Sequence, residues 1–284
     1  MRAGALRQIH LDPMGGVAGD MLLAGLLHAF PECADGVLEV SSRISGCVCS
    51  TRPCRDHALS GLRFQAQPPM HPDRHNDADH DHNTQDHPHI VWRDIRKRLE
   101  GAGLPLAVEH HAIGIFSILA AAEGEVHAVA PDDVTFHEVG AADSIADIIG
   151  AAWLIDHIGP ATWSCAPLPL GSGRVQTAHG LLPIPAPATA LLLKGFATID
   201  DGIPGERVTP TGAAILNYLQ CTPARAGIGT LTRSGFGFGT RHLPGLSNCL
   251  RILVFEAEPA LSHAAHRKLS VIAFEVDDQS PEDL

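Results

Sequence analysis

The stretch from Phe136 to Leu216 constrains this chain most, because it combines chemically active polar residues with turns that fix the backbone. It contains three blocks, FHEVGAADSIADIIG, APLPLGSGRVQTAHGLLPIPAPAT and VTPTGAAIL. His, Glu and Asp side chains bind metals or move protons, and here they stand among Gly and Pro residues. A domain with only a structural role spreads such residues out. Their concentration predicts a pocket with several convergent polar groups.

The composition indicates a globular protein of one large domain or two small ones. The chain has 284 residues, of which 45% are hydrophobic, and seven cysteines. An odd number of cysteines without a regular framework fits a reducing compartment, so we expect a cytoplasmic protein. No uninterrupted apolar run reaches the roughly 18 residues that span a bilayer, and no signal peptide is visible, which predicts no membrane partner. A net charge of -12 without a basic cluster predicts no nucleic-acid partner.

Near the N-terminus, a short strand over residues 6–11 is followed by Asp12, a Gly-rich turn and a helix over residues 18–30. Such a strand, turn and helix N-terminus form a common cradle for an anion or a metal. Asp12 and Asp20 stand on either side of the turn, so their carboxylates could share a cation. The alternative is that Asp20 only favours the first helical turn through the helix dipole.

Residues 66–90 differ in kind from the rest of the chain, because they are dominated by His and Asp. Too few apolar groups are present to offset the entropy of ordering, so we expect a disordered loop. Imidazole suits nickel, copper and zinc, and clustered imidazoles on a tether capture such ions. The alternative is an acidic solvated linker. The six candidate metal ligands are His71, His75, His80, His82, His87 and His89.

Helical periodicity predicts helices over residues 91–104, over 106–127 and from Asp143 onward. Between the last two, His137 and Glu138 follow a short strand and are candidate catalytic residues. Asp143 and Asp147 are four residues apart, so their like charges cost helix stability. That conflict favours a cation between them. The alternative is that Asp143 caps the helix and Asp147 is solvated.

Several Gly-rich turns and helix starts favour a bound anionic ligand. Gly permits close backbone approach, and Arg can donate two hydrogen bonds to a carboxylate or phosphate. The turn before a helix at residues 209–212 offers hydroxyls and free N–H groups, although Thr209 as an ordinary N-cap is an even alternative. The candidate substrate-binding residues are Gly171, Ser172, Gly173, Arg174, His179, Thr209, Thr211, Gly212 and Arg241.

The fold class that follows is mixed α/β, with helices packed on short sheets. Residues 228–241 predict turns and short strands, and two strand-like segments, CLRILVFEAE and LSVIAFEV, follow. We expect an N-terminal α/β segment (1–65), the His/Asp-rich loop (66–90), a main α/β domain for substrate and nickel (91–258) and the start of a truncated C-terminal nucleotide-binding domain (259–284). No βαβ register is evident, so the sheet order is left open.

Five segments, in order along the chain, resemble the nickel-insertion (LarC) proteins of nickel-pincer nucleotide cofactor biosynthesis. They are HLDPMGGVAGDMLLAGLL, the His/Asp tract, FHEVGAADSIADIIGAA, PLPLGSGRVQTAHGLLPIPAPATALLLKG and VTPTGAAIL. The resemblance implies insertion of nickel into pyridinium-3,5-bisthiocarboxylic acid mononucleotide, with formation of one carbon–nickel and two sulfur–nickel bonds. It implies a lyase-type insertase that consumes CTP and whose product serves lactate racemase and related enzymes. An alternative is a non-catalytic nickel store or metallochaperone.

The resemblance also implies roles and partners. Nickel would be collected by the His tract and passed to an internal set, while CTP with Mg²⁺ or Mn²⁺ would bind a C-terminal domain encoded separately or missing here. Activity is expected to need that domain, and an apo racemase would receive the cofactor; a homo-oligomer is compatible with this. Two short segments depart from the family pattern. Pro13-Met14-Gly15 replaces Cys-Phe-Ser, which removes a thiolate, and Thr135 replaces a His.

Overall fold

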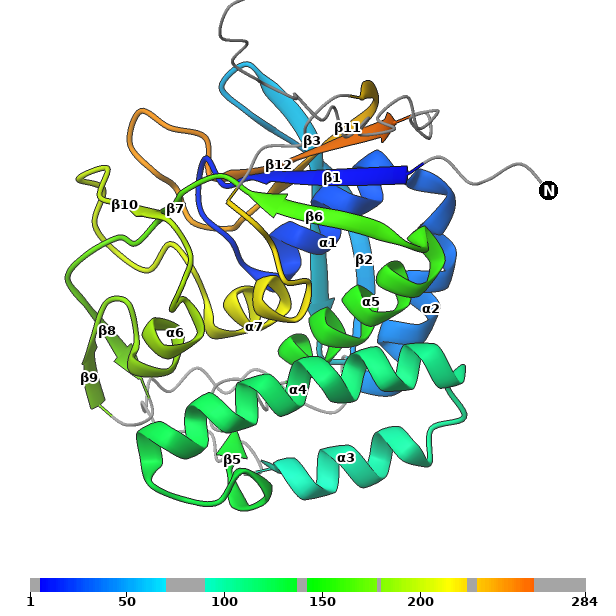
Figure 1. Cartoon of the computed structure of the whole chain (residues 1–284), viewed down its shortest axis with the longest axis vertical. Helices are drawn as coiled ribbons and strands as arrows, with labels where there is room; N and C mark the ends of the chain where they lie inside the picture. The colour runs from blue at the N-terminus through cyan, green and yellow to red at the C-terminus, as the bar shows by residue number, and fades with distance from the viewer. Residues whose placement is uncertain (1–5, 70–89, 137–141, 178–179, 224–228, 258–284) are drawn as a thin grey trace, which may run out of the picture.

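The computed structural model describes residues 6–69, 90–136, 142–177, 180–223 and 229–257. Its centre is a six-stranded mixed sheet in the order β2-β3-β11-β12-β1-β6 (Figure 1). β1 pairs in parallel with β6 and antiparallel with β12, so the first strand of the chain lies inside the sheet. The strands are β1 (Leu6–Asp12), β2 (Val48–Asp56), β3 (Leu59–Gln67), β6 (Ala161–Cys165), β11 (Thr230–Phe238) and β12 (Cys249–Ala257).

Helices pack below this sheet in successive layers (Figure 1). α1 lies against the sheet, α5 and α7 lie beyond it, and α4 and α3 are farthest away. The α-helices are α1 (Gly19–Ala29), α2 (Ala34–Ser45), α3 (Trp92–Glu100), α4 (Leu106–His127), α5 (Ala142–Ile158), α6 (Pro187–Leu192) and α7 (Pro210–Tyr218), with 3-10 turns η1 (Pro31–Cys33) and η2 (Pro131–Asp133).

Three two-stranded sheets complete the described part of the chain. β4 (Ile90–Val91) pairs with β5 (Thr135–Phe136), and β7 (Leu168–Pro169) pairs with β10 (Thr198–Ile199). β8 (Arg174–Thr177) and β9 (Gly180–Pro183) form an antiparallel ribbon. This ribbon follows β7 directly in the chain and brings Arg174 to the cavity described below.

Close contact between α1 and β11 depends on glycines in the strand. A Cβ on Gly237 would lie 1.9 Å from the Met21 carbonyl oxygen, and one on Gly235 would lie 2.2 Å from the Gly25 carbonyl oxygen. Both distances are far below contact, so only glycine lets the two backbones approach this closely. The expectation of turns and short strands over residues 228–241 was therefore wrong. The alternate glycines belong to one nine-residue strand whose face is covered by a helix.

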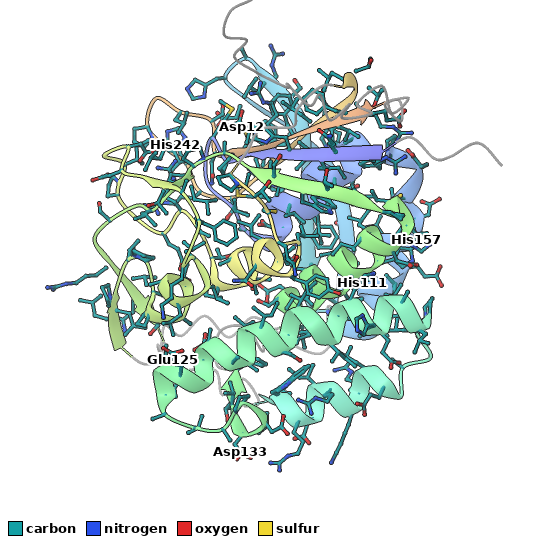
Figure 2. All side chains as sticks on the ribbon, viewed as in Figure 1. Asp12, His111, Glu125, Asp133, His157 and His242 are labelled. Atoms are coloured by element: carbon teal, nitrogen blue, oxygen red, sulfur yellow. The ribbon has the colours of Figure 1, made fainter. Side chains whose placement is uncertain are left out.

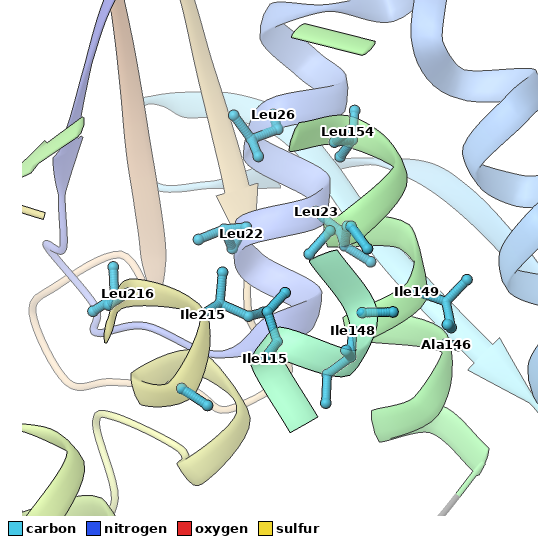
Figure 3. Close-up of a cluster of buried hydrophobic side chains, with 14 of the residues drawn as sticks. Leu22, Leu23, Leu26, Ile115, Ala146, Ile148, Ile149, Leu154, Ile215 and Leu216 are labelled. Carbon is cyan, nitrogen blue, oxygen red and sulfur yellow. The ribbon is translucent and has the colours of Figure 1, made fainter. Parts of the chain in front are cut away.

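The main hydrophobic core joins four helices (Figure 3). Leu22 and Leu23 of α1 meet Ile115 of α4, Ile148 of α5 and Ile215 of α7, and all five are almost fully buried. α1 is buried on nearly all sides, because nine of its eleven residues are buried between the sheet and the other helices. Burial of a Leu or Ile side chain stabilises the fold by about 1.5–3 kcal/mol, so this cluster holds the helix N-termini in place.

α4 is long and apolar enough on average to cross a membrane, in contrast to the expectation from uninterrupted apolar runs. In the described structure its apolar residues serve the core instead. Val108, Ile115, Phe116 and Leu119 are fully buried, and Phe116 stacks on Trp92 of α3 at 5.3 Å between ring centroids. Length and composition alone therefore do not distinguish this core helix from a membrane span.

The mixed α/β class is confirmed, and the expected helices begin and end within a few residues of their predicted bounds. The strand LSVIAFEV lies outside the described residues. Of the loop expected over residues 66–90, residues 66–67 instead end β3 and Ile90 begins β4, while residues 70–89 lie outside the described residues. The sheet combines strands from the expected segment 1–65 with strands from the expected domain 91–258. The proposed domain boundaries remain a prediction.

Candidate substrate cavity

A cavity of about 820 Å³ opens where the N-termini of α1 and α7 meet the first turn of α5. Parts of β3, β8 and the segments at residues 205–207 and 239–248 complete its wall. It brings together Asp20, Asp143, Arg174, Arg241 and Thr211, which the sequence placed in separate motifs. Thr209 also lines it. The pocket predicted from the concentration of polar residues is therefore present in the fold.

The α1 side of the cavity is acidic. The Asp20 carboxylate accepts a hydrogen bond from the Met21 N–H at 2.8 Å. Burial raises the pKa of Asp20 from 3.8 to about 6; the charge of Asp143 adds to the rise, while the Met21 N–H and Arg63 oppose it. A carboxylate in this range exchanges its proton near neutral pH.

Asp147 lies one helical turn after Asp143 and is turned toward the start of α1. A Cβ on Gly19 would lie 2.5 Å from the Asp147 Oδ2, so glycine is required for α5 to approach α1 here. Burial, followed by the charges of Asp20 and Asp143, raises the pKa of Asp147 well above its ordinary value, although the Asp20 N–H opposes this. Asp143 and Asp147 of α5 therefore do not form the isolated pair of carboxylates that the sequence suggested. Asp143 is exposed, and Asp147 forms a cluster with Asp20.

The α7 side of the cavity is not acidic like the α1 side, because the N-cap residue of α7 is the neutral Thr209. The Thr209 Oγ1 accepts a hydrogen bond from the Gly212 N–H at 3.1 Å, which confirms the N-cap interpretation. The Thr209 N–H in turn bonds to the Val17 carbonyl at 3.0 Å. Gly212 is buried, and a Cβ there would lie 2.5 Å from the Val17 carbonyl oxygen. Gly212 thus lies behind the cavity wall and lets α7 pack against the turn before α1.

Arg207 joins the loops that form the floor of the cavity. Its buried guanidinium donates to the carbonyls of Gly15 at 2.6 Å and Met14 at 3.1 Å, and makes two hydrogen bonds to Asp201 at 2.8 and 3.0 Å. Four bonds use most of the five N–H donors of an arginine. Arg207 therefore holds the wall together and has little capacity left for a ligand.

Two other arginines remain able to bind a ligand. Arg241 donates to the carbonyls of Pro204 at 3.0 Å and Glu206 at 3.5 Å. A Cβ on Gly205 would lie 1.7 Å from its guanidinium, so glycine makes room for this side chain. Arg174 at the start of β8 is exposed, and its side chain makes no hydrogen bond or ion pair with the described residues.

The turn at residues 171–173 shapes the cavity without lining it. Gly171 has φ +71°, and a Cβ there would lie 1.9 Å from the Gly205 carbonyl oxygen. The Ser172 carbonyl accepts a hydrogen bond from the Gly205 N–H at 2.7 Å. Gly171 and Ser172 thus fix Gly205 beneath Arg241, and Gly173 belongs to the same turn. Direct substrate contact by these three residues remains untested.

The structure separates Asp12 from Asp20. Asp12 ends β1 (Figure 2). It forms an ion pair with Arg251, its register partner on the neighbouring strand β12. Its carboxylate does not line the cavity. A cation shared by the two carboxylates is therefore not supported, because each has different partners.

The other predicted site residues cannot be placed. His137, Glu138, His179 and the six histidines of the tract lie outside the described residues. Within the described ranges, no group of three or more His, Cys, Asp or Glu side chains is arranged to hold a metal ion. Their proposed roles in metal binding and catalysis remain predictions.

Two further polar residues of the cavity are Arg207, which the sequence did not indicate, and Asp147, which the sequence indicated only as a partner of Asp143. Asp147 carried a signal, because its charge conflict with Asp143 was visible in the sequence. Arg207 carried none, since its partners Met14 and Gly15 lie more than 190 residues away in the chain.

Comparison with known proteins identifies the family. Residues 9–284 match the family model described as nickel insertion protein. The chain belongs to the nickel insertion protein family. The match includes the segments that form the cavity, so the cavity is the candidate site of a nickel insertion protein.

Individual nickel insertion proteins align over almost the whole chain. A protein of Pelobacter propionicus, provisionally named nickel insertion protein, is 41% identical over 281 residues, which are 96% of this chain and 66% of that protein. The pyridinium-3,5-bisthiocarboxylic acid mononucleotide nickel insertion protein of Akkermansia muciniphila is 35% identical over 279 residues, covering 98% and 66%. The chain thus spans about two thirds of the length of these relatives. No solved structure matches.

Proposed function

We propose that this chain acts in nickel insertion into pyridinium-3,5-bisthiocarboxylic acid mononucleotide, as the part of the insertase that binds nickel and the organic substrate. The name of the Akkermansia relative supports this substrate. In the reaction the pyridinium ring loses one C–H proton, a carbon–nickel bond forms in its place, and both thiocarboxylate sulfurs bind the metal. The protein must therefore hold a cation, an anionic ligand and a base close together.

The two-sided charge of the cavity is the observation that carries this proposal. Asp20, Asp143 and Asp147 on the α1 side attract Ni²⁺ and are suited to accept the ring proton. Arg174 and Arg241 offer positive charge to the phosphate and thiocarboxylates. A general base works best when its pKa is close to the working pH, and the pKa of about 6 for Asp20 meets that condition.

The remaining parts of the proposal concern nickel supply and energy. The His/Asp-rich tract collects nickel and transfers it to the cavity, where His137 and Glu138 assist Asp143 in the chemistry. CTP with Mg²⁺ or Mn²⁺ is used by a C-terminal nucleotide-binding domain. The product passes to an apo racemase of the lactate racemase type. We place this reaction in the cytoplasm, with a homo-oligomer as a compatible assembly.

An anaerobic insertion assay tests the proposal. The purified chain is mixed with nickel, CTP and the bisthiocarboxylate precursor, with and without a separately expressed C-terminal domain, and activation of an apo racemase is measured. Activation only with the added domain supports a nickel- and substrate-binding part. Activation by the chain alone would locate CTP use within these 284 residues. Stoichiometric nickel binding without activation in either mixture would favour the storage protein or metallochaperone instead.

A further inference from the structure

We infer that the phosphate of a pyridinium mononucleotide binds at the N-terminus of α7, where Thr211 recognises it through its hydroxyl and N–H groups. The inference rests on the proposed function for the class of substrate, and it adds the orientation of that substrate in the cavity. The phosphate lies on the α7 side, and the pyridinium ring lies toward the carboxylates at the start of α1.

Two helix N-termini meet at the cavity, and only one can accept an anion. They are close, since a Cβ on Gly212 of α7 would lie 3.1 Å from the Ala18 Cα. At the start of α1, the Met21 N–H already donates to Asp20, and the Asp20 N–H donates to the Asp147 carboxylate. A helix N-terminus favours negative charge, but here protein carboxylates supply it. A phosphate would meet repulsion on this side.

The first turn of α7 leaves one backbone N–H group available to a ligand. Pro210 has no N–H, the Gly212 N–H is bonded to the Thr209 side chain, and the Ala213 N–H is bonded to the Thr209 carbonyl at 2.9 Å. The N–H of Thr211 is left, since the first N–H groups of a helix lack partners within it. Thr211 therefore holds the remaining backbone donor in the first turn of α7.

The Thr211 side chain gives an independent indication of a ligand. Thr211 is 5% exposed and lines the cavity, yet its hydroxyl has no hydrogen-bond partner among the described residues. The hydroxyl is not wholly shielded, unlike that of Thr189, so it is accessible from the cavity and free to donate to a ligand there. A phosphate oxygen at this position accepts from both the hydroxyl and the N–H of one residue.

The positive charge needed to hold a phosphate is available in the same cavity. Arg174 has no partner among the described residues, and Arg241 keeps donors beyond its two carbonyl bonds. Arg207 is excluded because its guanidinium is occupied by Asp201 and two carbonyls. Glu206 also lines the cavity and is already engaged in another interaction. The two available arginines therefore line the same cavity as the helix end that offers free donors.

Calorimetric titration with two probes tests the inference on the full chain. The probes are a pyridinium-3-carboxylate mononucleotide and the corresponding riboside, which lacks only the phosphate. We expect the unmodified protein to prefer the mononucleotide. Thr211→Val should weaken mononucleotide binding about tenfold, as expected for loss of a hydrogen bond to a charged group, and leave riboside binding unchanged. Thr211→Ser keeps the hydroxyl and should restore the preference.

Thr189→Val is the matched control, because Thr189 is a fully buried threonine of α6 that does not line the cavity and whose hydroxyl also lacks a partner among the described residues. It should alter neither affinity. If Thr211→Val weakens both probes equally, or neither, the phosphate site at Thr211 is wrong. Equal affinity of the unmodified protein for both probes overturns the phosphate site but leaves the substrate class intact. Binding of neither probe overturns the substrate class as well.

Discussion

At the scale of single residues, the cavity contains carboxyl groups whose ionisation is disfavoured by burial. Asp147 and Asp20 each carry a raised pKa, and the largest cause in both is loss of water around the charged form. Such a pair stores unfavourable free energy when ionised, and arrival of a cation relieves it. The same groups that destabilise the fold at neutral pH are thus suited to nickel or a proton.

Asp147→Asn should stabilise the protein at pH 7.5 by about 1–2 kcal/mol, because it removes a carboxylate whose charge is disfavoured by burial. The folded pKa is raised, so the folded state binds more protons than the unfolded state, and stability falls as pH rises from the unfolded value of 3.8 through the folded pKa. The gain should shrink toward zero at pH 4.5. Thermal unfolding at both pH values measures it. An equal gain at the two values would contradict the assignment.

Arg207→Met should cost about 3–5 kcal/mol, since it leaves Asp201 and two loop carbonyls without their partner. The appropriate comparison is Arg93→Met, which removes an exposed ion pair with Asp133 at 3.4 Å and should cost less than about 1 kcal/mol. Urea unfolding of both variants gives the difference. Similar losses would show that Arg207 does not hold the cavity floor.

At the scale of elements, the contact between α1 and β11 sets the position of the acidic cluster. Gly235 and Gly237 bring the helix onto the strand at backbone distance, and Asp20 begins that helix. Another close approach, at Gly19, brings α5 to the same helix end. The carboxylates therefore meet because glycines let α5 and β11 approach the start of α1 closely.

Gly237→Ala should destabilise the protein by about 2–4 kcal/mol, because the new methyl group would lie 1.9 Å from the Met21 carbonyl oxygen and must displace α1. Gly101→Ala is the control. Gly101 ends α3 with φ -90°, and its nearest neighbour to an added Cβ is at 3.4 Å. This change should lie within about 0.5 kcal/mol of zero. Thermal or urea unfolding distinguishes the two, and equal effects would exclude steric displacement as the cause.

At the scale of the whole molecule, one cavity lies between a sheet and several helix layers, and the His/Asp-rich tract is inserted between β3 and β4. The tract carries six of the 18 histidines but adds few apolar groups to any core. The proposed nickel capture and the proposed cavity chemistry thus belong to different segments of the chain. Removal of the tract can therefore distinguish an insertase from a storage protein.

Replacing residues 71–89 with a short Gly/Ser linker should leave the midpoint of thermal unfolding nearly unchanged, because polar tracts contribute little to packing. The number of nickel ions bound, measured by calorimetry, should fall sharply. An insertase should then only need more nickel in the activation assay, whereas a storage protein should lose its function. Full nickel binding after the deletion would contradict capture by the tract.

The sequence by itself determined the helices at residues 19–29, 106–127 and 142–158, the mixed α/β class and the family, because periodicity and motif order are local properties of the chain. The tertiary structure decided which residues meet. It paired Asp12 with Arg251, joined Arg207 to the turn at Gly15, and turned Asp147 toward α1. These contacts link positions far apart in the chain, and no local pattern encodes them. Local motifs therefore indicated candidate site residues, whereas long-range packing determined which of them line the cavity.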